Sequence, residues 1–406
     1  MINRRTFSKG AVLAAIASPA IIGRAVADDE IRIASILDLS GGLDIYGKPT
    51  QMSMQMAVDE INDAGGLLGK KLKLITYDTQ SNNQLYAQYA QQAALQDKVH
   101  VVHGGLTSAS REVIRPILNR FKTLYVYSTT YEGGVCDRNT FCTGSTPAMD
   151  EKEPLKWAIK EYGKKIFSIG ADYNSPRIRA EWTKRYAAEN GATMTANEFF
   201  PLSVTEFGPI ITRIQVEKPD FIACCLIGAA HLGFYRQWAA AGMLNKIPIL
   251  GYSFGSGNEQ QMLPPSDSEG IVAPFTYFME IDSPENKAWV ERYKKKFGAN
   301  ALPQNCISMG GYEGTMLWAA AVKKAGSAER QAVIEAMEGG ASYTGPAGVL
   351  TVLGPLHHCA RDIYLGRCEG GAFKILTKWD QQFPADAEGK CDLLKNPDTN
   401  NQFTPI

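Results

Sequence analysis

An alternation of short apolar runs with amphipathic stretches constrains the fold of this chain most strongly. Apolar runs at residues 31–37, 72–77 and 99–103 are predicted to be strands, and each is separated from the next by a stretch with the apolar spacing of a helix, at 47–64 and 83–96. This order predicts a parallel sheet with right-handed crossovers and helices on both faces.

The same alternation begins again after residues 144–147. Predicted strands at 165–170, 193–200, 221–227 and 248–252 are interleaved with predicted helices at 153–162, 177–190, 207–218 and 230–241. We therefore predict an α/β protein of two doubly wound, Rossmann-like lobes, which suits a chain of 406 residues.

The lobes are expected to exchange chain more than once. Lobe I is assigned residues 28–146 and 275–344, and lobe II residues 147–274 and 345–406. Three crossover segments, near 144–147, 272–276 and 343–348, would form the hinge. A hairpin with Gly370-Gly371 at its turn and a polar surface strap from residue 381 onward are expected to complete the chain.

The first residues have the pattern of an export signal. Arg4-Arg5 precedes an apolar run at 11–22, and Ala25-Val26-Ala27 then offers a small-x-small cleavage site. This pattern resembles a twin-arginine signal peptide spanning residues 1–27. The apolar run is too short to cross a bilayer, so we expect the mature protein in the periplasm.

Charge excludes some partners. The chain carries 42 basic and 42 acidic residues, and removal of the signal would leave it mildly acidic. No basic tract is present, so neither nucleic acid nor an anionic membrane is an expected partner, and we expect a monomer. The glycine-rich loop at 39–47 matches neither a dinucleotide fingerprint nor a P-loop, so no cofactor is expected.

Eight cysteines in an exported chain favour some disulfides. Cys136 and Cys142 bracket a five-residue loop and are the predicted pair. Two of Cys359, Cys368 and Cys391 are candidates for a second pair. The run at 357–359, His-His-Cys, lacks a recognised metal-ligand spacing, so no metal site is predicted.

Two polar loops follow neighbouring predicted strands. Residues 104–110 lead from the strand at 99–103 into a helix that begins near Thr107 and Ser108, and the strand at 123–127 ends in Ser128 and Thr129. The first amides of a helix have no partner inside it. These loops can cap and turn the chain, or they can bind a ligand at the strand ends of an open sheet.

The stretch 62–74, between a helix and a strand, resembles the hallmark of type I periplasmic binding proteins, which serve ABC importers of branched-chain amino acids, amides and urea. The loop at 39–41, residues 104–110 and the helix at 310–321 support this resemblance, which covers essentially the whole mature chain. It implies a binding protein rather than an enzyme, with a membrane permease as its partner.

Segments 107–111, 127–133 and 168–177 are most similar to the urea and short-chain-amide branch of that family. By this resemblance Ser108, Tyr127 and Thr129 match ligand-contacting positions, and Ser175 falls where some amide receptors have a tyrosine. The expected ligand contacts are Thr107, Ser108, Tyr127, Ser128, Thr129, Tyr173, Ser175 and Tyr252.

Side-chain charge also favours a neutral ligand. An amino-acid site needs an acid to pair with the ammonium group, yet residues 221–238 contain none. Asp172 or Glu259 could still supply this charge, so an amino-acid ligand stays an alternative. A second alternative is an exported α/β-hydrolase, because Gly251–Gly255 matches Gly-x-Ser-x-Gly around Ser253, with His357 or His358 following. No helix is predicted directly behind Ser253, which argues against a nucleophile elbow.

Overall fold

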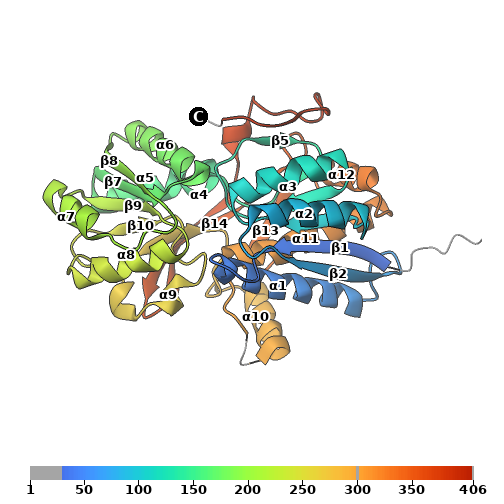
Figure 1. Cartoon of the computed structure of the whole chain (residues 1–406), viewed down its shortest axis with the longest axis horizontal. Helices are drawn as coiled ribbons and strands as arrows, with labels where there is room; N and C mark the ends of the chain where they lie inside the picture. The colour runs from blue at the N-terminus through green and yellow to red at the C-terminus, as the bar shows by residue number, and fades with distance from the viewer. Residues whose placement is uncertain (1–29, 299–300, 405–406) are drawn as a thin grey trace, which may run out of the picture.

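The computed structural model describes residues 30–298 and 301–404, which form two lobes side by side (Figure 1). The predicted signal peptide, residues 1–27, lies outside this part of the chain. Within the described ranges, none of the helices combines the length and apolar character needed to cross a membrane.

The first lobe is a parallel sheet with strand order β2-β1-β3-β4-β6. One apolar cluster joins the sheet to α1, α11 and α12, and another joins its opposite face to α2 and α3. The bounds of these elements are β1 Glu30–Leu37, α1 Asp44–Asp63, β2 Lys71–Asp78, α2 Asn83–Leu95, β3 Val101–Gly104, α3 Ser108–Arg120, β4 Leu124–Tyr127, β6 Thr140–Cys142, α11 Cys306–Ala325 and α12 Arg330–Glu338.

The second lobe repeats this plan, with parallel strand order β11-β10-β9-β7-β8. Helices α5 and α6 cover one face, and α7 and α8 the other. The bounds are α4 Pro147–Asp150, α5 Lys152–Tyr162, β7 Lys165–Ala171, α6 Asn174–Glu189, β8 Thr193–Phe200, α7 Gly208–Glu217, β9 Phe221–Cys225, α8 Ala229–Ala240, β10 Ile249–Gly251, α9 Glu259–Met262 and β11 Val272–Phe275. The next helix, α10 (Pro284–Phe297), contacts α1 and α11 of the first lobe. The predicted fold of two doubly wound α/β lobes is confirmed.

One long strand, β14 (His358–Glu369), passes between the two sheets. Its beginning pairs with β6 and with β13 (Gly348–Leu353), whereas its end pairs with β11 and β15 (Ala372–Gln382). Residues 343–348, where the third crossover was predicted, instead belong to the hairpin of β12 (Ser342–Gly345) and β13, with the turn at 346–347. Gly348 has a φ of 99° there, a conformation that suits a tight turn.

The end of the chain returns from the second lobe to the first. After β15, residues 385–387 form a short 3₁₀ turn, and β16 (Asn400–Gln402) pairs antiparallel with β5 (Val135–Asp137). We call residues 385–402 the C-terminal strap; it crosses above the first lobe in Figure 1.

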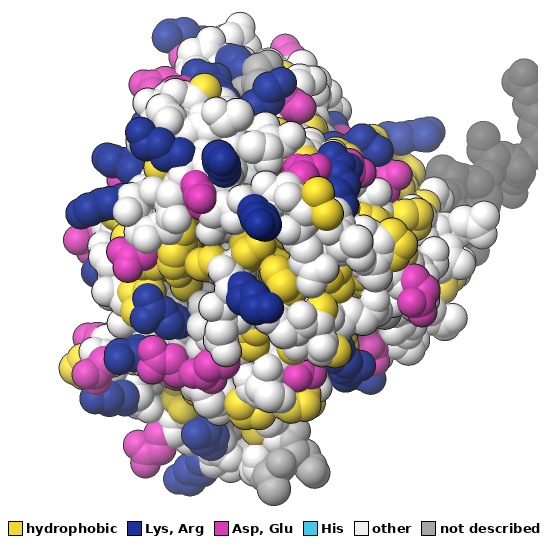
Figure 2. Space-filling view, turned by 90° about the vertical axis from the view of Figure 1, so that its left-hand side faces the viewer, with side chains coloured by type: hydrophobic (Ala, Val, Ile, Leu, Met, Phe, Trp, Pro, Cys, Tyr) yellow, Lys and Arg dark blue, Asp and Glu magenta, His cyan; other side chains and the backbone are white. Residues whose placement is uncertain are grey.

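The end of the second lobe seen in Figure 2 carries basic and acidic side chains interspersed, with hydrophobic side chains between them.

The predicted disulfide between Cys136 and Cys142 is wrong. Cys136 is bonded to Cys391 of the strap, 255 residues away. Cys136 packs in a small apolar cluster with Cys391, whereas Cys142 packs among the tyrosines beneath α3. Because the two side chains enter different clusters, they cannot meet. Cys359 and Cys368 are free and buried, so the proposed pairing within the last three cysteines is also wrong.

Candidate functional site

A tight glycine turn brings the start of α3 to the edge of the first sheet. Gly104 has a φ of 145°, and a Cβ there would lie 2.2 Å from the Ile36 carbonyl oxygen. Only glycine fits this approach. The Thr107 hydroxyl then caps α3 by accepting a hydrogen bond from the Ser110 amide at 3.1 Å. This turn and cap fix the position of Ser108, the first residue of the helix.

A cavity of about 50 Å³ lies between the lobes, where strands of both sheets end. The first lobe lines it with Tyr46, Leu106, Thr107, Ser108, Thr129, Thr130 and Ile307. The second lobe lines it with Tyr173, Ser175, Arg179, Cys225, Ile227, Tyr252, Ser253 and Ser256. An enclosed cavity of aromatic rings, hydroxyls and a few apolar side chains, at this edge of open α/β sheets, is typical of a small-molecule site.

A smaller compartment of about 20 Å³ lies behind this cavity and shares Tyr46, Leu106, Thr129 and Ile307 with it. His103 lines the compartment, and burial lowers the pKa of its imidazole to about 3. The ring is therefore neutral at pH 7 and offers one donor and one acceptor. No sequence motif indicated this histidine as a site residue, because a single histidine within a strand is usually part of the core.

The structure divides the predicted ligand contacts into three groups. Those in the main cavity are Thr107, Ser108, Thr129, Tyr173, Ser175 and Tyr252. Ser128 lines the inner compartment instead. Tyr127 lines neither space, because its buried hydroxyl donates to the Leu106 carbonyl at 2.9 Å and supports that residue from behind.

Arg179 is the most consequential lining residue that was not predicted. It lies one helical turn after Ser175 on α6, and this spacing of four residues could have indicated it. Its guanidinium contacts Asp150 at 2.8 Å and Glu151 at 3.2 Å, and all three side chains are buried. Burial raises the pKa of Glu151 to about 8 even though Arg179 opposes the shift. The arginine at the wall of the cavity is thus already paired with a buried carboxylate, Asp150.

The two acids considered as partners for a ligand ammonium lie elsewhere. Asp172 is exposed and pairs with Arg177 at 2.7 Å. Glu259 is buried; it accepts hydrogen bonds from the Gly255 and Gly257 amides at 2.7 and 3.0 Å and lies 3.2 Å from His231. Among the described residues, the lining of the main cavity contains no carboxylate.

Ser253 lacks the surroundings of a catalytic nucleophile. Its hydroxyl donates to the Leu226 carbonyl at 2.7 Å, and the nearest imidazole nitrogen, Nε2 of His231, is 3.5 Å away. That nitrogen is closer to the Tyr235 hydroxyl, at 2.9 Å. The next helix, α9, begins six residues after Ser253 rather than directly behind it.

The histidines at 357 and 358 belong to the first lobe's core. His357 stacks on Phe141 and lies 3.1 Å from Glu338, while His358 contacts Tyr131. Over residues 30–298 and 301–404, no three histidine, cysteine, aspartate or glutamate side chains converge as a metal site.

The fold and the interlobe cavity together define a two-lobed, small-molecule-binding protein. A family model described as "Periplasmic binding protein" matches residues 30–372, and the chain belongs to this family of binding proteins rather than to a family of enzymes.

Relatives and solved structures share this architecture at low sequence identity. The Leu/Ile/Val-binding protein homolog 6 of Brucella melitensis is 23% identical over 88% of this chain and 92% of its own length. The leucine-, isoleucine-, valine-, threonine- and alanine-binding protein of Pseudomonas aeruginosa is 24% identical over 84% of this chain and 90% of its own length. A solute-binding protein of an ABC transporter from Rhodopseudomonas palustris, in complex with 3,4-dihydroxybenzoic acid, aligns with a TM-score of 0.79 at 22% identity, covering 89% of this chain and all of that one.

Proposed function

We propose that this chain is the periplasmic solute-binding component of an ABC importer and captures a small uncharged nitrogen compound, urea or a short-chain amide, between its lobes. The observation that carries this proposal is the charge balance of the cavity. Its one charged lining residue among those described, Arg179, is neutralised by Asp150.

A charged ligand would find no free counter-charge in this cavity. A carboxylate would compete with Asp150 for Arg179, and an ammonium group would meet no lining carboxylate. Burying an uncompensated charge is costly, whereas a neutral amide needs only hydrogen bonds. Hydroxyls from both lobes, including those of Thr129 and Ser175, can supply them.

Branched-chain amino acids are the alternative, because the names of several relatives refer to them. An aromatic acid is a further competitor, because a structural neighbour holds one. Both kinds of ligand carry a carboxylate, and an amino acid also carries an ammonium group. Neither Asp172 nor Glu259 lines the cavity, and each already has a partner, Arg177 and His231 respectively, which speaks against the ammonium.

In this proposal the ligand favours the closed form, because only that form completes the contacts from both lobes. A membrane permease would recognise the closed protein, and no bond is made or broken. We also propose that the protein is a monomer. It should bind no nucleic acid, in keeping with its balance of basic and acidic residues.

The test is the thermal shift of the mature chain, from Asp28 onward, with urea, acetamide, formamide, leucine, glutamate and benzoate. A ligand at a hundred times its dissociation constant stabilises a protein by about 2.7 kcal/mol, which gives a clear shift. Urea or an amide should raise the midpoint. If only leucine, glutamate or benzoate does so, the proposed ligand class is wrong.

A further inference from the structure

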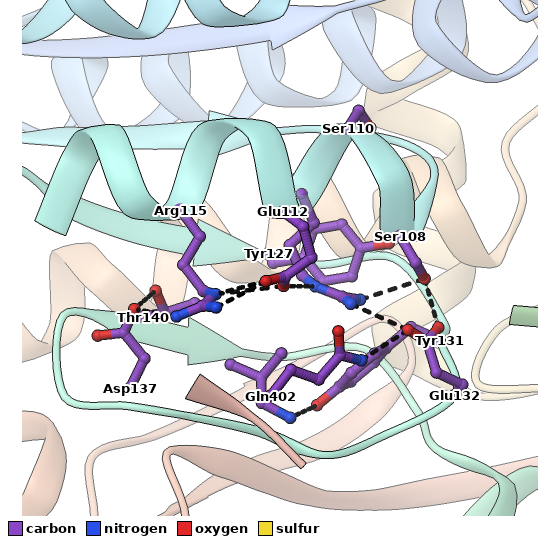
Figure 3. Close-up of polar contacts among 12 residues, drawn as sticks. Ser108, Ser110, Glu112, Arg115, Tyr127, Tyr131, Glu132, Asp137, Thr140 and Gln402 are labelled. Carbon is purple, nitrogen blue, oxygen red and sulfur yellow. Dashed lines mark hydrogen bonds and ion pairs between the residues drawn. The ribbon is translucent and has the colours of Figure 1, made fainter. Parts of the chain in front are cut away.

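The carboxylate of Glu132 lies directly behind Ser108 (Figure 3). The Ser108 hydroxyl donates its hydrogen bond to Oε2 of Glu132 and accepts one from Nη1 of Arg111 at 3.2 Å. Nη2 of Arg111 reaches Oε1 of Glu132 at 3.0 Å, and both of these side chains are fully buried. The hydroxyl that lines the cavity is thus held between a carboxylate and a guanidinium.

Oε1 of Glu132 gathers further donors from distant parts of the chain. Asn174, at the start of α6 in the second lobe, donates to it at 3.3 Å, and Gln402 of the C-terminal strap donates at 2.7 Å. Burial opposes ionisation, but the charge of Arg111 and the hydrogen bonds from Ser108 and Gln402 still lower the pKa of Glu132 below its ordinary value. Glu132 is therefore ionised at pH 7, and an ionised carboxylate can only accept.

A serine hydroxyl has one proton and two lone pairs. Ser108 uses its one proton to donate a hydrogen bond to Glu132, and Arg111 donates a hydrogen bond to one of the two lone pairs. The remaining lone pair is all that Ser108 can offer to the cavity that it lines. Ser108 is consequently an acceptor toward any bound molecule, which a residue name alone would not reveal.

We propose that Glu132 determines ligand specificity by fixing Ser108 as an acceptor, so that the site selects a ligand N–H at this corner and rejects a carboxylate oxygen. This inference rests on the proposed function and narrows it: the amide nitrogen of the ligand binds at Ser108. A carboxylate in the same place would set one acceptor against another. A buried acceptor without a donor is costly, so amides should bind better than acids of the same shape.

Isosteric pairs test this inference: acetamide with acetate, propionamide with propionate, and benzamide with benzoate. For the wild-type mature chain, the amide of a pair that fits should bind at least about tenfold more tightly than the acid, as measured by calorimetry at pH 7. A wild-type preference for the acid overturns the inference.

Glu132→Gln should reverse the direction of the Ser108 hydrogen bond. The donors from Arg111, Asn174 and Gln402 all converge on Oε1, so the glutamine carbonyl belongs there and its NH₂ group replaces Oε2. Ser108 then accepts from that NH₂ group and turns its proton toward the cavity. We expect the amide-to-acid affinity ratio to fall at least about tenfold in this variant.

Asp137→Asn is the matched control. Asp137 is a fully buried carboxylate that pairs at 3.1 Å with Arg115 of α3, the helix that also carries Arg111. It does not touch Ser108 (Figure 3). Its loss should lower the unfolding midpoint and leave the amide-to-acid ratio unchanged. A ratio that shifts equally in both variants would mean that Glu132 acts only through stability, and the inference would fail.

Ser108→Ala decides the matter independently if Glu132→Gln does not fold. Removal of the acceptor should weaken amide binding at least about tenfold, and it should not weaken acid binding, because the acceptor that opposes a carboxylate is gone. Unaltered amide affinity overturns the inference. If the wild type binds amides and the ratio survives in Glu132→Gln, only the inference fails. If neither urea nor any amide binds to the wild type, the proposed function fails and the inference with it.

Discussion

Both lobes bury an arginine near the cavity, but they surround it differently. In the first lobe Arg111 pairs with the buried Glu132 and stands behind Ser108, so it does not line the cavity. In the second lobe Arg179 lines the cavity itself and faces two buried carboxyls, Asp150 and Glu151.

This difference shifts the pKa values of the two glutamates in opposite directions. Arg111 also pairs with Glu112 at 2.9 Å, but Glu132 accepts further hydrogen bonds from Ser108 and Gln402, so its pKa is lowered in spite of burial. Glu151 shares its guanidinium with Asp150, so burial prevails and raises its pKa to about 8. The first group of side chains orients the Ser108 hydrogen bond, and the second pairs the arginine that lines the cavity with buried carboxyl groups.

The largest expected effect follows from removal of the shared arginine. Arg179→Met leaves Asp150 buried without its cation and should lower the free energy of unfolding by about 3–5 kcal/mol. Thermal unfolding by calorimetry measures this loss. Because Arg179 also lines the cavity, ligand affinity should fall too. A stable variant with unchanged affinity would contradict the role of this cluster.

Loss of the disulfide should act on the first lobe. Cys391→Ser frees the strap that carries Gln402 to Glu132 and should cost about 2–4 kcal/mol of unfolding free energy. Calorimetry should give the same loss for Cys136→Ser, and the double variant should add nothing. Additive losses would show that the two cysteines do not form one bond.

The glutamates should give opposite pH dependences. The folded pKa of Glu151 exceeds its unfolded value of 4.5, so its contribution to stability is present below about pH 4.5 and is lost as the pH rises toward 8. The unfolding free energy of the wild type relative to Glu151→Gln should therefore fall over this range, by at most about 1.4 kcal/mol per pH unit.

Glu132 has a lowered folded pKa, so its contribution is present above about pH 4.5 and is lost as the pH falls further. Relative to Glu132→Gln, wild-type stability should stay constant between pH 6 and 9. Thermal melts across this range compare the two variants directly. A falling stability difference for both variants between pH 6 and 8 would remove the distinction between the two glutamates.

The smallest effect is expected at Ser253, whose proton is already bound by the Leu226 carbonyl. Ser253→Ala should change ligand affinity by about threefold or less, in contrast to Ser108→Ala. A titration of both variants with the same amide tests this contrast. A larger loss at Ser253 would show that its hydroxyl turns to the ligand.

Local patterns predicted most of the fold. Strand β8 at residues 193–200 has the predicted bounds, and α2 ends one residue before the predicted helix at 83–96, because apolar periodicity and capping residues act within a few positions. The third crossover, predicted near residues 343–348, was misplaced, since these residues belong to a hairpin rather than a hinge. Only the pairing of β14 with strands of both sheets distinguishes the two, and that pairing is not local.

Part of the candidate site could be predicted from the sequence for the same reason. Hydroxyls at strand ends, such as Ser108 and Thr129, could be named from their loops. The pairing of Cys136 with Cys391 could not, because spacing along the chain favoured a nearer partner. The charge balance of Arg179 also depends on Asp150, which precedes it by 29 residues and approaches it only after folding.

The hydrogen bond from Gln402 to Glu132 can form only late in the synthesis of the chain. The two residues are 270 positions apart, so at roughly 5–20 residues per second the strap leaves the ribosome tens of seconds after the loop that it completes. Until then Glu132 lacks one of its donors, and the corner around Ser108 is unfinished. The earliest moment at which the protein can discriminate among solutes is thus set by translation near residue 402, long after every first-lobe strand from β1 to β6 has been made.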